Sequence, residues 1–288
     1  MLGKWSLGLC LLALIAVASF IWVSSVGVKP SYEVSKNIRY GFLVENSTAE
    51  YIEEASFRVF APVKKNSYQQ TVDITASLPF DIELDRFGNQ TLVFKLSKLA
   101  PRASQIVKVT VSLQLASEPQ RVLLDAEAPY LVAEENIEVD SPEINKLAEK
   151  LSSQGVKIQN IATWINQNIS DVGYVAEDRG AHYAITTKQG DCTEFSSAFV
   201  ALARASSIPS RMIGGFILEQ SGRVQAENYH NWGEFRLDDA WHLADPQNNK
   251  IDSGYGSYIA FYNFNKHSRM SNSHRFLSYD PRLSVQML

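Results

Sequence analysis

Residues 189–211 read QGDCTEFSSAFVALARASSIPSR, and this stretch predicts a helix that begins at a cysteine. Asp191 is followed three residues later by Glu194, which is the pattern of a capping box at a helix start. Apolar residues then recur with helical spacing at Phe195, Ala198, Phe199 and Leu202. Cys192 therefore takes the first helical position, next to backbone N–H groups that have no partner within the helix.

A cysteine in this position is a candidate nucleophile, because the positive end of a helix dipole stabilises a thiolate. The dipole alone is too weak for this task. Moving a thiol from its ordinary pKa of ~8.5 to ~5.5 takes about 4 kcal/mol, whereas a helix terminus supplies about 0.3–1 and at most about 2. Asp191 also opposes ionisation, so a neighbouring cation is needed, and histidine is the expected source.

Strand spacing separates the five histidines, which are His182, His230, His242, His267 and His274. The segments NYHNWGEFRL (228–237) and AWHLADP (240–246) flank Asp238-Asp239, and this predicts a hairpin that pairs Leu237 with Ala240. Counting by twos then places one set of residues on a single face: His230, Trp232, Glu234, Trp241, Leu243 and Asp245. His230 and Asp245 are diagonal neighbours in this register, and His242 points to the other face. A loop of three or five residues would reverse the faces.

Each of these residues also has a structural interpretation. A single histidine in a strand is more often packed than catalytic, and Asp245 before Pro246 can open a turn. Trp232 and Trp241 can belong to the core. The combination of a helix-start cysteine with a paired imidazole and carboxylate nevertheless favours nucleophilic catalysis by Cys192, His230 and Asp245.

The segments GDCTEFSSAFVALARASSIPSRMIGGF, HNWGEF and WHLADP together resemble the transglutaminase-like superfamily of papain-type cysteine enzymes, over about residues 140–265. The resemblance implies a Cys-His-Asp triad at Cys192, His230 and Asp245, and a central helix that starts at the cysteine and packs on a sheet. It also implies that an immunoglobulin-like domain precedes the catalytic module. Thr193, and Ser206-Ser207 where a glycine commonly precedes Ile-Pro, depart from the family pattern.

The region before the helical part predicts a β-sandwich. Residues alternate between apolar and polar in several runs between 31 and 116, such as Ile38 to Val44 and Val107 to Leu115, and turn residues separate these runs. About seven strands are expected. The fold class is therefore α+β, with a β-sandwich at 30–128 followed by a transglutaminase-like catalytic domain at 140–288, where a helix packs on an antiparallel sheet.

The 24 residues from Trp5 to Val28 carry no charge, and an uncharged, largely apolar run of this length can cross a bilayer. Residues 1–29 are therefore either a membrane anchor or a cleaved signal peptide, because Ala16-Val17-Ala18 has the form of a cleavage site. Both alternatives place residues 30–288 outside the cytoplasm, on the periplasmic side. Cys10 lies inside the apolar run, so Cys192 has no disulfide partner in the exported part, which favours a reactive role.

The composition limits the partners. A net charge of −4 with no long basic run gives no reason to expect nucleic acid, so protein or peptide substrates are expected, together with the membrane through residues 5–28. No cofactor and no metal are expected, since no acidic cluster has calcium-site spacing. No acidic cluster that would hold an amine is apparent near the triad either. Attack of the Cys192 thiolate on an amide would form a thioester, which either water or an amine would resolve. The alternative is a non-catalytic binding or scaffold module with a degenerate enzyme fold.

Overall fold

The computed structural model describes residues 31–122, 126–153, 155, 157–264, 276–278 and 280–288. The predicted membrane segment Trp5–Val28 lies outside these residues. Within the described ranges, no helix is both long and apolar enough to cross a membrane. Tyr32–Leu288 form one compact unit by their internal contacts.

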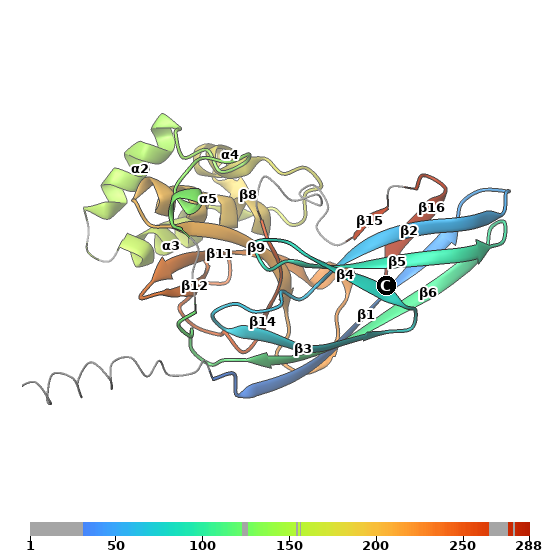
Figure 1. Cartoon of the computed structure of the whole chain (residues 1–288). Helices are drawn as coiled ribbons and strands as arrows, with labels where there is room; N and C mark the ends of the chain where they lie inside the picture. Colours follow the sequence, from blue (N-terminus) through green and yellow to red (C-terminus); the bar gives the residue numbers. More distant parts are fainter. Residues whose placement is uncertain (1–30, 123–125, 154, 156, 265–275, 279) are drawn as a thin grey trace, which may run out of the picture. The chain divides into compact units, whose positions relative to one another are not determined.

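The first part of the chain forms two sheets packed face to face (Figure 1). Its strands are β1 (Val34–Asn46), β2 (Ile52–Ala61), β3 (Gln69–Ala76), β4 (Phe80–Leu84), β5 (Gln90–Leu99) and β6 (Ser104–Leu115). One sheet contains β1, β6 and β3, and the other contains β2, β5 and β4, with antiparallel pairing throughout. The apolar positions that alternate in the sequence, among them Ile38, Phe94 and Val109, are buried in the shared core. The predicted β-sandwich is therefore confirmed.

Three strands from later in the chain complete the sandwich, which differs from the expectation of about seven strands from residues 31–116 alone. These are β10 (Gly222–Arg223), β15 (Phe276–Ser278) and β16 (Leu283–Met287). β10 and β16 pair with β1, and β15 pairs with β2. Leu283 and Met287 of β16 supply apolar side chains to the sandwich core.

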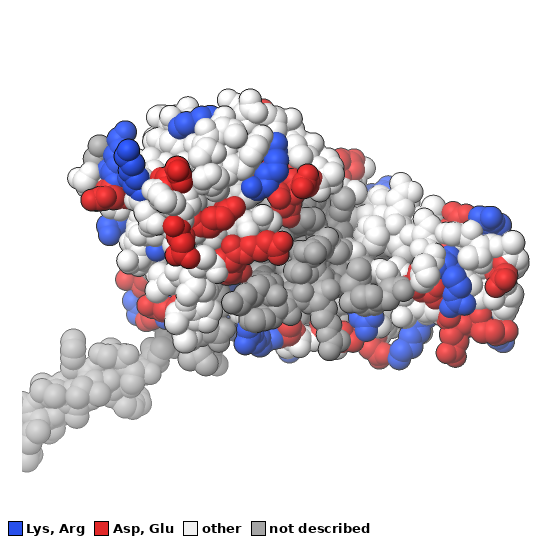
Figure 2. All heavy atoms as spheres, turned by 90° about the horizontal axis from the view of Figure 1, so that it is seen from above, with Lys and Arg blue, Asp and Glu red and all other residues white. Residues whose placement is uncertain are grey.

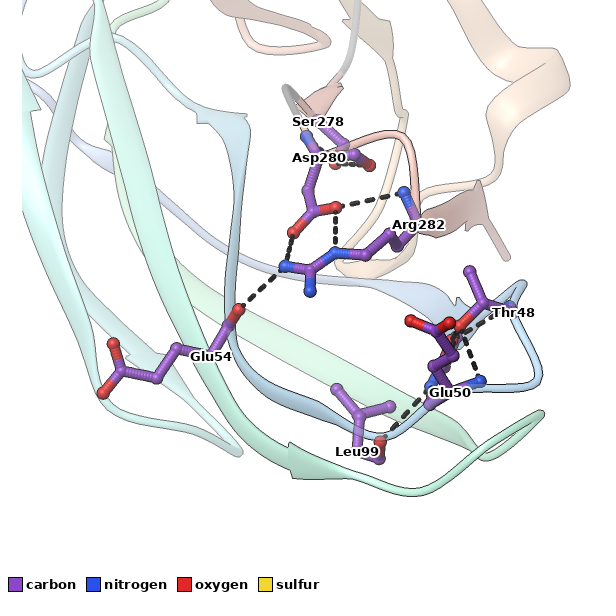
Figure 3. Close-up of polar contacts among 8 residues, drawn as sticks. Thr48, Glu50, Glu54, Leu99, Ser278, Asp280 and Arg282 are labelled. Atoms are coloured by element: carbon purple, nitrogen blue, oxygen red, sulfur yellow. Dashed lines mark hydrogen bonds and ion pairs between the residues drawn. The ribbon is translucent and has the colours of Figure 1, made fainter.

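The turn between β15 and β16 is fastened to the sandwich by charged groups (Figure 3). Arg282 Nη2 donates to Asp280 Oδ2 at 2.7 Å and to the backbone carbonyl oxygen of Glu54 in β2 at 3.2 Å. Asp280 Oδ1 also accepts from the backbone N–H of Arg282. The turn therefore links β16, which pairs with β1 of one sheet, to β2 of the other sheet.

The second part of the chain packs helices on one side of an antiparallel sheet (Figure 1). The sheet has the order β13 (Lys250–Ile251), β12 (Ala240–Asp245), β11 (Tyr229–Leu237), β9 (Ser210–Ile217) and β14 (Tyr258–Asn263). The helices are α2 (Pro142–Ser152), α3 (Lys157–Asn168), α4 (Gly180–Thr187) and α5 (Cys192–Ala205), and short segments are η1 (Ala128–Tyr130), β7 (Ser170–Asp171), β8 (Gln189–Gly190) and η2 (Ala226–Asn228). α5 contacts β11, β9 and β12. The predicted helix on an antiparallel sheet is confirmed.

The α5 helix reaches the sheet closely because β11 carries a glycine beneath it. A Cβ atom on Gly233 would lie 2.4 Å from Phe199 of α5. Residues 192–205 are almost entirely buried, so this helix forms the centre of the second core. The sheet and helix are thereby held at a fixed separation, which sets the distance between residues on α5 and residues on β11.

Candidate active site

The start of α5 has the capping box that the sequence predicts. The Asp191 side chain accepts from the backbone N–H of Thr193 at 2.8 Å, and Glu194 Oε2 accepts from the backbone N–H of Asp191 at 3.0 Å. The second oxygen of Asp191 accepts from the backbone N–H of Val175 at 3.0 Å. Cys192 is the first residue of the helix, and its position is fixed by hydrogen bonds on both sides.

Glu194 is fully buried and is held by a cation that the sequence did not reveal. Arg179 Nη2 lies 3.0 Å from Glu194 Oε2, and the backbone N–H of Arg179 donates to Oε1 at 2.9 Å. A buried carboxylate needs such partners, because its desolvation is costly without them. Gly190 leaves room for this side chain, since a Cβ atom there would lie 2.4 Å from Cβ of Glu194. The Gly-Asp-Cys sequence is thus a packing requirement of the helix start.

The hairpin that carries the other two residues has the predicted register. Leu237 pairs with Ala240, and the pairing continues to Gly233 and Ala244. Asp238 and Asp239 form a two-residue turn with φ of 47° and 62°. Two successive positive φ angles are typical of a type I′ turn, whose twist matches that of the flanking strands. The parity on which the face assignment rests is therefore confirmed.

His230 and Asp245 are in direct contact. His230 Nε2 lies 2.7 Å from Asp245 Oδ2, and the side chains are 12% and 1% exposed. Oδ2 also accepts from Asn248 Nδ2 and from the hydroxyl of Tyr258, both at 2.8 Å. Strand alternation predicts the imidazole and the carboxylate of this pair. It does not predict Asn248 and Tyr258, because a turn residue and a residue of another strand carry no such periodic signal.

The pKa values of this pair shift in opposite directions. Burial lowers the pKa of His230, but hydrogen bonds and charge interactions with Asp245 and Cys192 outweigh it and raise the pKa to about 9. Burial raises the pKa of Asp245, but the contacts with His230, Asn248 and Tyr258 outweigh it and hold the pKa below its ordinary value. The imidazole is therefore a cation at neutral pH and the carboxylate is an anion.

Cys192 and His230 line the same pocket, which has a volume of about 500 Å³. The hydrogen bond between the Cys192 side chain and the imidazole is one of the contacts that raise the pKa of His230. The structure thus brings together the three residues that the sequence selected from distant segments. A partly exposed thiol beside a cationic imidazole is the arrangement of an activated nucleophile.

Carboxylates line this pocket, which the sequence did not indicate. They belong to Asp171, Asp178 and Glu227, with Asp191 at the helix start, and no described lysine or arginine lines the pocket. The pairing of β7 with β8 brings Asp171 beside the start of α5. Tyr174, which is 84% exposed, lines the same pocket. These residues come together on one pocket only in three dimensions, so the sequence, in which no acidic cluster is apparent near the triad, carries no sign of this lining.

A second pocket of about 420 Å³ adjoins the first, and both are lined by Asp171, His230 and Gln247. Gln247 Nε2 donates to Asp171 Oδ2 at 2.9 Å. Asn166, Phe195 and Asn248 are among its other lining residues. His230 is therefore reachable from two pockets, one of which contains the thiol.

The remaining histidines are separate from this site or lie outside the described ranges. His242 Nδ1 lies 2.7 Å from Asp252 Oδ1 on the other face of the hairpin, as the sequence predicts. His182 Nδ1 lies 3.0 Å from the hydroxyl of Ser141 on the molecular surface. His267 and His274 belong to residues 265–275, which the structure does not describe. Within the described ranges, no group of three or more His, Cys, Asp or Glu side chains has the arrangement of a metal site.

Comparison with known proteins identifies the fold. The family model of the transglutaminase-like superfamily matches residues 144–246. A candidate cysteine protease from Cytophaga hutchinsonii is similar at 16% identity with a TM-score of 0.57, over 88% of this chain and 92% of that chain. The periplasmic domain of TgpA from Pseudomonas aeruginosa is similar at 14% identity with a TM-score of 0.38, over 77% of this chain and 96% of that chain.

A search of curated proteins found no match. The likeness to the Cytophaga hutchinsonii protein extends over both the sandwich and the helical part, and it concerns the fold. The family model covers the segment that contains Cys192, His230 and Asp245. The segment 144–246 of this chain is therefore similar to the transglutaminase-like superfamily.

Proposed function

We propose that the protein is a cysteine enzyme that acts on amide bonds of proteins or peptides through a thioester at Cys192. The observation that carries the proposal is the contact of His230 with Asp245 at 2.7 Å, in a pocket that also contains Cys192. This combination supplies a nucleophile, a proton donor and a group that orients the donor. A non-catalytic scaffold has no use for a buried imidazole–carboxylate pair next to a free thiol.

The chemistry follows from the protonation of the pair. The Cys192 thiolate attacks the amide carbonyl carbon, and the new S–C bond forms as the tetrahedral intermediate develops. His230 gives its proton to the departing nitrogen, the C–N bond breaks, and the amine leaves. Water or a second amine then attacks the thioester, passes a proton to His230, and releases the thiolate. The backbone N–H of Cys192 is positioned at a helix start to donate to the oxyanion.

The pocket supports acyl transfer to an amine beside hydrolysis. Asp171, Asp178 and Glu227 line the pocket that contains the thiol, and carboxylates attract protonated amines. An acceptor amine must be held at a high effective concentration to compete with water at ~55 M. The carboxylates are the feature that favours such a site, whereas hydrolysis needs none.

The location of the enzyme is proposed from the sequence. The uncharged run Trp5–Val28 supports an anchored or secreted protein whose residues 30–288 lie on the periplasmic side of the membrane. A reporter that is active only in the cytoplasm, fused after Leu288, should be inactive, and most of the protein should sediment with membranes. An active reporter would exclude export. On the face drawn in Figure 2 the lysine and arginine side chains are dispersed, and this face gives no support to nucleic acid as a partner.

The activity is tested with a library of glutamine-containing and other peptides, with and without a labelled primary amine. Cys192-dependent release of free acid identifies a hydrolase, and Cys192-dependent incorporation of the label identifies an acyltransferase. Both should disappear in Cys192→Ala and His230→Ala and persist in His242→Ala, which removes a histidine from the other face. Turnover that persists in Cys192→Ala would contradict the proposed mechanism. Absence of turnover by the parent chain with every peptide would favour the scaffold alternative.

A further inference from the structure

The carboxylate of Asp245 accepts hydrogen bonds from other groups besides His230, the histidine that it orients. Oδ2 accepts from His230 Nε2 at 2.7 Å, from Asn248 Nδ2 at 2.8 Å and from the Tyr258 hydroxyl at 2.8 Å. Oδ1 accepts from the backbone N–H of Asn248 at 3.2 Å. Asp245 is 1% exposed, so these contacts take the place of water. Nothing in the triad itself requires the two additional side-chain donors.

Tyr258 reaches Asp245 from the far edge of the sheet. It begins β14, which pairs with β9 and not with the hairpin that carries His230 and Asp245. The Tyr258 ring is 3% exposed and packs edge-on against Trp232, with ring centroids 5.2 Å apart. Burial and the Asp245 carboxylate raise the pKa of Tyr258, so the hydroxyl keeps its proton and donates it to Oδ2. A rigid strand outside the hairpin thus supplies one anchor for the carboxylate.

The same contacts determine which nitrogen of His230 carries a proton in the neutral ring. An ionised Asp245 is only an acceptor, so the nitrogen beside it, Nε2, must be the donor. Asn248 Nδ2 lies 3.3 Å from His230 Nε2. Both nitrogens are donors, and they lie close together because each donates to Asp245 Oδ2. Nδ1 is therefore left to exchange protons with the thiol and the substrate. This tautomer depends on the carboxylate keeping its orientation.

We infer that Tyr258 and Asn248 are positioning residues that hold Asp245 Oδ2 on His230 Nε2 and thereby keep His230 Nδ1 available to Cys192. The inference rests on the proposed function. Asp245 has rotatable side-chain bonds, and the contact with His230 alone would let the carboxylate and the ring move together. Tyr258 ties the carboxylate to β14, and Asn248 ties it to the turn after β12. The pair is then fixed to two separate parts of the fold.

The test follows alkylation of Cys192 by iodoacetamide against pH in a chain that carries Cys10→Ala, so that one thiol remains. In Tyr258→Phe we expect the alkylation rate near pH 6 to fall about tenfold and the midpoint to move upward, which is the effect of one hydrogen bond to a charged group. The ring stays in place, so the packing on Trp232 is kept. The other acidic residues that line the pocket with His230, which are Asp171, Asp178, Asp191 and Glu227, are unchanged in all variants.

Tyr255→Phe is the matched control. The Tyr255 side chain is also buried, and its hydroxyl donates to a different aspartate, the half-exposed Asp252, at 2.5 Å. A purely structural role of a tyrosine–aspartate hydrogen bond would therefore lower the stability of both variants and leave both pH profiles alike. We expect Tyr255→Phe to keep the profile of the parent chain. Identical profiles for the two variants, or a downward midpoint in Tyr258→Phe, would overturn the inference.

Asn248→Ala gives an independent test, because Asn248 is exposed and its loss does not threaten folding. The substitution removes the Nδ2 donor and keeps the backbone N–H that donates to Asp245 Oδ1. We therefore expect an upward shift of the alkylation midpoint that is smaller than in Tyr258→Phe. No shift at all would overturn the assignment of Asn248. The parent chain separates this inference from the proposed function. A parent thiol whose alkylation is independent of His230 would contradict the function. A His230-dependent parent with unshifted variants would contradict only the positioning roles.

Discussion

The Tyr68 hydroxyl of the sandwich donates to Glu234 Oε1 of β11, and both side chains are fully buried. Glu234 Oε2 also accepts from Arg211 Nε at 2.7 Å, and Trp232 Nε1 donates to the Tyr68 oxygen at 3.3 Å. A buried carboxylate is stable only with such a set of donors. The sandwich therefore provides part of the environment that holds the strand on which His230 lies.

Tyr68→Phe should lower the free energy of unfolding by about 1–3 kcal/mol, because it leaves a buried Glu234 oxygen without its donor. The variant should also slow alkylation of Cys192, since Trp232 loses a partner next to His230. Urea denaturation and the alkylation rate measure the two effects. Tyr40→Phe serves as control, because its hydroxyl donates to the Phe60 carbonyl oxygen at 3.2 Å within the sandwich alone. Loss of thiol reactivity in the control would contradict the specific link through Tyr68.

Cys192 alkylation should depend on His230 and not on His242. The helix start supplies too little stabilisation for a thiolate by itself, and His230 supplies the cation. His230→Ala should therefore move the midpoint of the pH profile upward, whereas His242→Ala should leave it in place because that ring contacts Asp252 on the other face. Coincident profiles for the two variants would contradict the assignment of faces.

His230 should titrate with a midpoint near the value of about 9 that its contacts produce. Because this pKa is raised above the ordinary value of ~6.5, the stabilisation of the charged ring is complete below ~6.5 and is lost as the pH rises through about 9. Histidine ring ¹⁵N spectra recorded from pH 5 to 10 measure the midpoint directly. Asp245→Asn should lower it, because the neutral amide removes the charge that favours the imidazolium. A midpoint unaffected by Asp245→Asn would exclude the carboxylate as the cause.

Thr193→Val should destabilise the start of α5. Asn231 Nδ2 donates to Thr193 Oγ1 at 2.9 Å, and Asn231 is 1% exposed. Valine leaves this buried donor without its acceptor, at a cost of about 1–3 kcal/mol in the free energy of unfolding. Thr193→Ser keeps the hydroxyl and should retain most of the stability in urea denaturation. Equal losses in the two variants would show that the methyl group, and not the hydrogen bond, is what matters.

Asp239→Gly should stabilise the hairpin, because Asp239 has a φ of 62° that glycine adopts without steric cost. We expect an increase of up to about 1 kcal/mol, or roughly 2–4 °C in Tm. Asp239→Val at the same exposed position should lower Tm, since a β-branched residue disfavours this backbone conformation. A lower Tm in Asp239→Gly would contradict the turn geometry.

Local sequence pattern was sufficient to predict the secondary-structure elements described above and part of the candidate site. The capping residues fixed the start of α5 at Cys192, because a helix start needs side-chain partners that are close in sequence. Alternation placed His230 and Asp245 on one face, because successive strand residues point to opposite sides. The buried residues of the sandwich were found for the same reason. These features depend on interactions over a few residues, and so they can be read from the chain.

The sequence by itself determined the helix start, the hairpin register and the choice of Cys192, His230 and Asp245, since backbone geometry and side-chain period act locally. Tertiary structure alone decided that Tyr258 and Asn248 hold Asp245 and that β15 and β16 return to the sandwich. It also decided that Asp171, Asp178 and Glu227 line the pocket that contains Cys192. These contacts join residues that are far apart in the chain or that lie in turns. Their formation depends on how whole sheets pack to bury apolar surface, and no short stretch of sequence carries that information.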